Sequence, residues 1–212
     1  MKALYLSYFL NENTPIYGGK TGTLRFEKLT SISNGDTSNS QKFELPAHAG
    51  THIDFPFHFS NKGKKCIDYP ASFWFFNKVD FLNCTINEFE SQINYLNYDI
   101  EILILKTGFG AKRGTDEYWS EQPVIPSCFA SLLKKKFPLL RVFGFDLISL
   151  TSKQNRPEGK KAHIDFLIHN DILILEDMDL NYLNINPNLV IIAPLQVEGA
   201  DGVPCNVLSF FN

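Results

Sequence analysis

The sequence lacks the features that mark a membrane protein, a disulfide-bonded scaffold or a nucleic-acid-binding protein. Its 212 residues contain no apolar run near the roughly 18 residues that can span a bilayer. The four cysteines lie far apart and form no Cys-x-x-Cys pair, which predicts free thiols in a cytoplasmic protein. The net charge is −3 and basic runs are short. We therefore expect neither a membrane nor a nucleic acid as a partner.

The composition indicates an ordered globular protein, with 44% hydrophobic and 14% aromatic residues. The length predicts a single domain over residues 1–212. The apolar run at residues 3–10 is short and contains tyrosine and serine, and no small-residue cleavage site follows it. It predicts a buried first strand rather than a signal peptide.

The distribution of apolar residues predicts a mixed α/β fold. The first half is mostly β, with strands at residues 24–33 and 41–46 around the turn Asn34-Gly35-Asp36. An aromatic cluster at residues 73–76 is assigned to the core, with the wall of a substrate pocket as the alternative. Strands and helices alternate in the second half, which is typical of an α/β core. The predicted strands there are 100–105, 140–145, 172–175, 189–193 and 206–211, and the predicted helices are 85–96, 126–137 and 159–170.

One segment, His48–His58, holds three of the five histidines and an aspartate. Histidine nitrogen and aspartate oxygen are the usual ligands of zinc and similar divalent metals. Glycine and proline within the segment argue for an extended or looped backbone. Side chains two apart on an extended chain share a face, so His52 and Asp54 are expected to project together. A turn at Gly50 would bring His48 to the same ion. The segment therefore predicts a metal site.

The segment resembles the His-x-Gly-Thr-His-x-Asp-x-Pro-x-His signature of the metal-dependent cyclase family, which includes kynurenine formamidase and isatin hydrolase. The resemblance covers nearly the whole chain and implies a largely β core, with a barrel-like sheet and helices packed around it. The other segments that resemble the family are, in order, Thr107–Phe109, Gly114–Tyr118, Gly144–Ser149, His163 with Ile172–Glu176, and Glu198–Pro204.

The resemblance implies a set of metal ligands. By the family pattern, His48, His52 and Asp54 bind one divalent metal. Asp54 would bridge to a second ion held by His163 and Glu176. Three ligands leave positions open for water, as a catalytic site requires. Zinc is the expected metal and manganese the alternative, with one or two ions per chain.

The resemblance also assigns roles outside the ligand set. His58 is implied as the general acid and base, because histidine titrates near neutrality. Phe57, in the aromatic-rich histidine segment, and Tyr17, in the loop that the family associates with the pocket, are expected as substrate contacts. The chain has Tyr17-Gly18-Gly19-Lys20 where the family has a Pro-Gly-Asp turn. His163 and Glu176 are thirteen residues apart, one more than in the family pattern, and His169 offers a competing ligand. The preferred assignment of His169 is a solvated helix end.

Several polar residues have alternative assignments. Asp146 either supports the metal ligands or caps the loop beside it. Tyr118 and Trp119 are expected to pack a helix rather than flank the pocket. Asp201 and its neighbour Glu198 are expected to stabilise a glycine-rich turn rather than take part in chemistry.

The implied activity is hydrolysis of a C–N bond in a small aromatic amide, formamide or lactam, with an aryl formamide as the expected substrate. One alternative is a lyase or dehydratase on the same site. Another is a metal-containing binding protein without catalysis, although the presence of His58 argues against it. A small molecule is the expected partner, and the resemblance implies a homodimer or homotetramer.

Overall fold

The computed structural model describes residues 2–212. Its main element is a nine-stranded sheet in the order β5-β10-β11-β4-β9-β8-β7-β6, with β1 also paired to β11. The strands of this sheet are β1 Lys2–Tyr5, β4 His52–Asp54, β5 Phe75–Phe76, β6 Val79–Asn83, β7 Ile102–Lys106, β8 Val142–Phe145, β9 Leu173–Glu176, β10 Leu189–Pro194 and β11 Gly202–Phe211.

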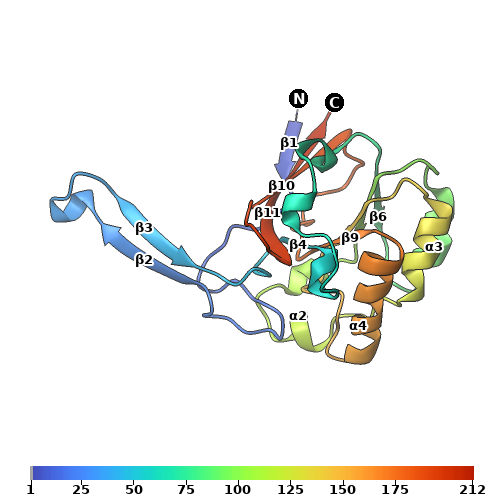
Figure 1. Ribbon diagram of the computed structural model, residues 1–212, viewed down its shortest axis with the longest axis horizontal. Helices are drawn as coiled ribbons and strands as arrows, with labels where there is room; N and C mark the ends of the chain where they lie inside the picture. The colour runs from blue at the N-terminus through green and yellow to red at the C-terminus, as the bar shows by residue number, and fades with distance from the viewer. Residues whose placement is uncertain (1) are drawn as a thin grey trace.

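Helices lie beside the sheet, with α3 and α4 on one side of it (Figure 1). The α-helices are α1 Phe89–Gln92, α2 Glu117–Ser120, α3 Cys128–Lys136 and α4 Arg156–Ile164, and α4 continues as a π-helical segment, η7 Asp165–His169. The 3-10 helices are η1 Ile32–Asn34, η2 Pro56–His58, η3 Cys66–Asp68, η4 Ala71–Trp74, η5 Ile93–Tyr95 and η6 Phe109–Lys112. None of the helices described between residues 2 and 212 is long and apolar enough to cross a membrane.

The sheet has a parallel part and a larger antiparallel part. Strands β6 to β9 run parallel, and Ile102 to Leu105 of β7 are all buried, as expected for a strand covered on both faces. Strand β4 joins the two parts, because it pairs antiparallel with both β9 and β11. The predicted fold class, a mixed α/β protein with a largely β, barrel-like core, is confirmed.

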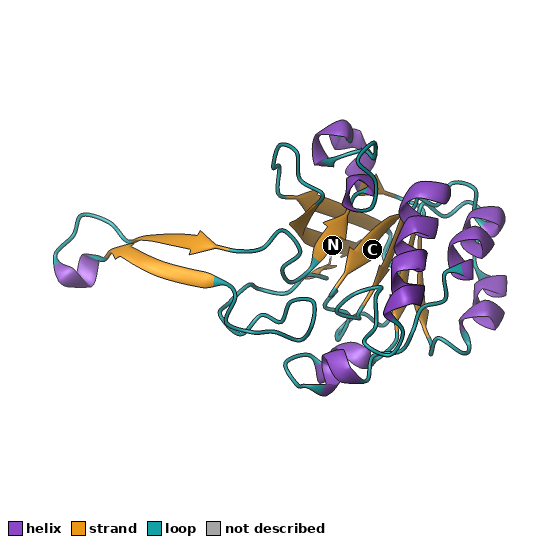
Figure 2. Ribbon diagram, turned by 60° about the horizontal axis from the view of Figure 1, so that its bottom comes forward, coloured by secondary structure: helices purple, strands orange, loops and turns teal. Residues whose placement is uncertain are grey.

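A hairpin of β2 Arg25–Thr30 and β3 Ser40–Glu44 forms a separate two-stranded sheet. It extends away from the rest of the molecule (Figures 1 and 2). Phe26 and Phe43 face each other across it, with ring centroids 6.4 Å apart. The predicted pair of strands is therefore confirmed, but it lies outside the main sheet.

Two local predictions are corrected, and one strand was not predicted. Strand β1 ends at Tyr5 and is largely exposed, because it pairs only with β11 at a margin of the sheet. The helix predicted over 85–96 is reduced to α1 and η5. Strand β6 was not predicted, since Asp80 interrupts its apolar pattern. Asp80 is buried and accepts hydrogen bonds from the Asn97 backbone and the Asn186 side chain.

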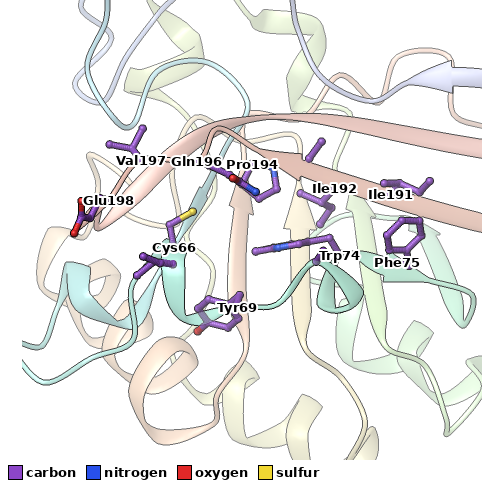
Figure 3. Close-up of a pocket in the computed structure, with 13 residues that line it drawn as sticks. Cys66, Tyr69, Trp74, Phe75, Ile191, Ile192, Pro194, Gln196, Val197 and Glu198 are labelled. Atoms are coloured by element: carbon purple, nitrogen blue, oxygen red, sulfur yellow. The ribbon is translucent and has the colours of Figure 1, made fainter.

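The aromatic cluster at residues 73–76 divides between two surroundings. Phe76 is fully buried in the core, as predicted. Trp74 and Phe75 line a cavity of about 630 Å³ beside β10, together with Cys66 and Tyr69 (Figure 3). This cavity is separate from the histidine cluster described below. All four cysteines are free, which confirms the prediction of unpaired thiols.

Candidate metal centre

Strand β4 places two of the predicted ligands side by side. His52 and Asp54 are two residues apart on an extended strand and project from one face, as the sequence predicted. In the register with β9, His52 lies opposite Glu176. His52 Nε2 is 3.2 Å from Glu176 Oε2. The pairing of β4 with β9 thus brings together residues that are far apart in the sequence.

His48 reaches Asp54 from the turn that precedes β4. Gly50 adopts a φ of +62°, a conformation that favours glycine, and it reverses the chain as predicted. His48 Nδ1 lies 2.8 Å from Asp54 Oδ1. Gly202 of β11 makes room for the imidazole, because a Cβ at that position would lie 2.4 Å from the ring.

Helix α4 supplies the fifth side chain of the cluster. His163 Nε2 lies 3.5 Å from both Asp54 Oδ2 and Glu176 Oε1. The π-helical segment η7 follows α4 and leads the chain toward β9, which carries Glu176. His169 is exposed and binds Asp165 instead, with 2.8 Å between His169 Nδ1 and the carboxylate. The structure therefore places His163, not His169, in the cluster.

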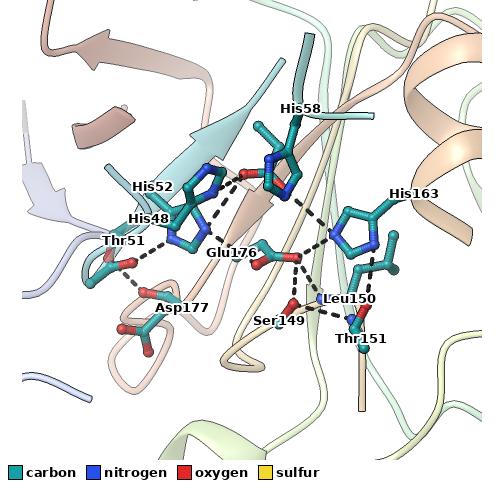
Figure 4. A network of polar contacts seen from close by, with 12 residues as sticks. His48, Thr51, His52, His58, Ser149, Leu150, Thr151, His163, Glu176 and Asp177 are labelled. Carbon is teal, nitrogen blue, oxygen red and sulfur yellow. Dashed lines mark hydrogen bonds and ion pairs between the residues drawn. The ribbon is translucent and has the colours of Figure 1, made fainter. Parts of the chain in front are cut away.

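Backbone carbonyls orient two of the histidines. His52 Nδ1 donates to the Gly50 carbonyl and His163 Nδ1 to the Gly159 carbonyl, each over 2.8 Å. Each ring therefore presents Nε2 to the carboxylates (Figure 4). Metal-binding histidines usually donate their other ring N–H in this way, which fixes the tautomer and the ring orientation.

Glu176 is held from the loop after β8. Its Oε1 accepts hydrogen bonds from the Leu150 backbone N–H and from Ser149 Oγ, the latter over 3.3 Å. On the other side, Thr51 Oγ1 donates to the Asp177 carbonyl over 2.5 Å, which joins the start of β4 to the end of β9. The residues flanking Glu176 and His52 thus fix the spacing between these two side chains.

The charges of the cluster stabilise one another. Burial lowers the pKa of His48 and His163, but the neighbouring carboxylates outweigh it and raise these values to about 9 and about 10. Burial raises the pKa of Asp54, yet its contacts with His163 and His48 hold it well below the usual range. A divalent cation would replace the protons on these rings, because histidine binds metal only when its nitrogen is deprotonated.

The residues fit a divalent metal. Ligand atoms of His52, Asp54 and Glu176 lie within 4.8 Å of one another, and so do those of His48, Asp54 and His58. The two groups share Asp54, whose Oδ1 is buried, lies 2.8 Å from His48 Nδ1 and 3.6 Å from His52 Nε2, and forms no aligned hydrogen bond among residues 2–212. A buried carboxylate oxygen without an aligned donor is costly, and a cation beside these two ring nitrogens would satisfy it. His48 and His52, which the family pattern groups with Asp54, both approach Asp54 Oδ1.

His58 stands at the rim of the cluster beside Asp201. Its Nδ1 donates to Asp201 Oδ2 over 2.7 Å, and His48 Nε2 donates to the same oxygen over 3.1 Å. Partial burial raises the pKa of Asp201, but these two contacts outweigh it and lower the value. The sequence assigned Asp201 to a turn, and this is corrected: the carboxylate lies in the cluster, carried there by the pairing of β11 with β4.

The cluster lines a cavity of about 520 Å³, a size that suits a small-molecule ligand. Tyr17 lines it, as predicted, and so does Phe59, which stacks on His163 with 4.7 Å between ring centroids. The prediction for Phe57 is corrected, because its ring lies outside this cavity, beneath the Lys65 ammonium. The 3-10 turn η2 breaks the alternation that would have put residues 57 and 59 on one face.

The remaining assignments concern residues around the cavity. Asp146 caps the loop at residues 107–110, where it accepts three backbone N–H groups and the Thr107 hydroxyl. Tyr118 is buried, as predicted, and donates to Asp177 over 2.7 Å. The sequence did not indicate Arg156 and Lys160, which also line the cavity. Their spacing from His163 along one helix face was the available signal.

Comparison with known proteins identifies relatives for nearly the whole chain. The model of a family described as "Putative cyclase" matches residues 4–151. The kynurenine formamidase of Bacillus cereus is 30% identical over 202 residues, which cover 94% of this chain and 92% of the relative. A solved isatin hydrolase bound to the product analogue thioisatinate superimposes with a TM-score of 0.78 at 17% identity, covering 98% of this chain and 91% of that chain.

A second solved structure, described as a potential metal-dependent hydrolase with cyclase activity, has a TM-score of 0.74 at 22% identity. It is matched over 98% of this chain and 96% of its own. These two structural likenesses support the fold. The sequence matches extend from the first strand through the histidine segment and beyond it. This chain therefore belongs to the cyclase family.

Proposed function

We propose that the chain is a metal-dependent hydrolase that cleaves a C–N bond in a small aromatic molecule, with an aryl formamide as the substrate. The observation that carries this proposal is the His58–Asp201 pair, 2.7 Å apart, at the edge of a metal-ligand cluster that lines a cavity of about 520 Å³. The similarity to a kynurenine formamidase over 94% of the chain supports it. A site that only bound metal would not need this histidine–carboxylate pair.

When bound, a divalent metal lowers the pKa of a water molecule and polarises a carbonyl oxygen. The chain itself supplies the proton transfer. With Nδ1–H donated to Asp201, the neutral His58 ring carries its lone pair on Nε2. His58 takes a proton from the attacking water and delivers it to the nitrogen, while the hydroxyl joins the formyl carbon and the C–N bond breaks. Asp201 stabilises the charged ring between these steps. The products are formate and an aryl amine.

Ligands from three parts of the chain hold the ion in this proposal. They are the half-buried His48 with the buried His52 and Asp54 from the histidine segment, and the buried His163 and Glu176. Nitrogen and carboxylate donors suit zinc, and manganese is the alternative. Asp54 belongs to both groups of ligand atoms, so the proposal includes either one ion at Asp54 or two ions on either side of it. Metal analysis of purified protein at saturation gives both the element and the ratio.

The assembly proposed is a homodimer or homotetramer of single-domain chains in the cytoplasm. Strand β11 near the C-terminus pairs with β1 at the N-terminus, which supports one domain. The projecting hairpin exposes Leu29, Ile32 and Phe43 by 55%, 59% and 56%. A two-stranded hairpin is marginally stable alone, so contact with a second copy would bury its apolar side chains.

The test compares the wild type with His58→Ala on formanilide, with metal content measured in the same samples. We expect the variant to keep its metal and lose at least about 100-fold in kcat, the usual contribution of general acid–base catalysis. Formate release that matches amine release identifies hydrolysis, whereas a lyase would consume no water. Full activity of His58→Ala would remove this residue from the mechanism.

A further inference from the structure

Two cationic side chains lie at the mouth of the cavity, and the reaction proposed above does not use them. Arg156 and Lys160 belong to α4, four residues apart, and both line the cavity that contains the histidine cluster. Residues at this spacing lie on the same face of a helix. His163 continues this face into the cluster, three residues beyond Lys160. The helix therefore presents two charges and a metal-site histidine to one space.

Neither cation is neutralised within the protein. Among residues 2–212, no carboxylate oxygen lies within 4.0 Å of the Arg156 guanidinium or the Lys160 ammonium. Their neighbour Lys161 is exposed, as Arg156 and Lys160 are, but it does not line the cavity. Two unpaired positive charges that share one cavity repel each other, and an anion between them would relieve this repulsion.

Aromatic packing restricts Arg156. Its guanidinium lies over the Trp119 ring, 5.8 Å from the centroid, within the range of a cation–π contact. Trp119 in turn meets the ring of Tyr17 edge to face, with centroids 4.8 Å apart. Tyr17 also lines the cavity. The arginine is thus held beside an aromatic wall, an arrangement that suits recognition of a planar carboxylate on an aromatic ring.

We propose that Arg156 and Lys160 form an anion subsite that selects substrates carrying a carboxylate on the side of the molecule away from the scissile bond. The proposal rests on the hydrolase function above and adds its specificity. The histidine cluster would hold the formamide end of the substrate, and the two cations at the mouth would bind the carboxylate. The cavity of about 520 Å³ has room for an aromatic ring between the two ends.

The experiment uses two matched compounds, 4-formamidobenzoate and its neutral carboxamide, 4-formamidobenzamide. The wild type and an Arg156→Gln/Lys160→Gln variant are compared by the ratio of kcat/KM for the two compounds. We expect the wild type to have the higher kcat/KM for the carboxylate. In the variant, the kcat/KM ratio of carboxylate to carboxamide should fall roughly tenfold, mainly through a higher KM for the carboxylate, because partly exposed charge pairs contribute modestly to binding. Lys161→Gln, on the same helix, is the matched control and should keep the wild-type ratio.

A charge reversal tests the sign of the subsite, and a binding measurement tests the subsite without requiring hydrolysis. Arg156→Glu/Lys160→Glu, which reverses both charges, should turn the preference toward 4-formamidobenzylamine, which carries a positive charge at the same position. Calorimetric titration of metal-loaded protein with each compound measures the subsite even if no compound is hydrolysed, in which case the proposed function fails separately. Equal affinity of the wild type for the carboxylate and the carboxamide, or the same drop in preference for Lys161→Gln, would overturn the subsite.

Discussion

At the scale of single residues, the centre depends on two buried histidines whose rings are held so that one nitrogen of each faces the carboxylates. The hydrogen bonds from His52 to Gly50 and from His163 to Gly159 leave only Nε2 of each ring available. Asp54 Oδ1 is buried, lies 2.8 Å from His48 Nδ1 and forms no aligned hydrogen bond among residues 2–212. Such a site is arranged for a cation before the cation arrives, and its residues can be tested one at a time.

The first prediction concerns His52. Replacing it with alanine removes a buried nitrogen donor from the cluster, so His52→Ala should bind zinc at least about 100-fold more weakly than the wild type, since even changes beyond the ligands cost 10–100-fold. His169→Ala is the control, because His169 lies outside the cluster and binds Asp165. Metal content after dialysis provides the measurement. Equal metal in the His52→Ala variant and the wild type would contradict the ligand assignment.

The second prediction concerns Gly202, whose missing Cβ leaves space for His48. A Cβ there would lie 2.4 Å from the imidazole, and the ring would have to move away from Asp54 and Asp201. Gly202→Ala should therefore weaken metal binding about tenfold in a protein that still folds. The control is Ala200→Gly in the preceding turn. Gly199→Ala is unsuitable, because Gly199 has a positive φ that an alanine would adopt only with strain. Unchanged metal affinity in Gly202→Ala would show that the ring position is not critical.

At the scale of elements, α4 reaches the sheet through a close contact. Gly159 packs on the loop after β8, where an added Cβ would lie 2.5 Å from Thr151 Cα. This approach brings His163 to Asp54 and Arg156 to the cavity. The π-helical segment η7 then returns the chain to β9 with Glu176 in register. The helix therefore sets both the metal ligands and the charges at the mouth.

The third prediction follows from this contact. Gly159→Ala should lower the free energy of unfolding by about 1–3 kcal/mol, the usual cost of overpacking, and should also reduce metal affinity because His163 moves with the helix. Thermal unfolding followed by circular dichroism and metal titration are the two measurements. Lys161→Ala on the exposed side of α4 is expected to match the wild type in both. A stable Gly159→Ala variant with normal metal binding would show that the helix can shift without effect.

At the scale of the whole molecule, the hairpin is the element least explained by one copy of the chain. It forms its own sheet, projects from the body (Figure 2) and exposes large apolar side chains. A second copy that covers these side chains would account for their exposure, since large exposed apolar groups gathered on one element mark interaction surfaces.

The fourth prediction tests this contact. Leu29→Asp/Phe43→Asp should convert the proposed oligomer to monomers, measured as molar mass by light scattering, while the main sheet keeps its unfolding temperature within about 2 °C, because surface changes outside the core have small effects. Leu139→Asp is the control, because Leu139 is equally exposed, at 50%, on the body of the molecule. A monomeric wild type, or an unchanged mass in the double variant, would contradict the proposed role of the hairpin.

The predictions that held depend on short-range information. Alternation on an extended strand put His52 and Asp54 on one face, and Gly50 provided the turn for His48. The predictions that failed involve a local departure from regular geometry or a distant partner. The 3-10 turn η2 moved Phe57 out of the cavity, and buried hydrogen bonds to Asp80 allowed a strand where the apolar pattern was broken.

The sequence by itself determined the fold class, the family resemblance and the residues of the histidine segment. These follow from spacing, backbone preference and donor chemistry, which act between residues near one another in the chain. Tertiary structure alone placed Asp201 beside His58. It also directed Arg156 and Lys160 toward the cavity. Sheet register and helix packing decide these positions. They bring together residues more than a hundred positions apart, for which the separation along the chain does not predict the distance in space.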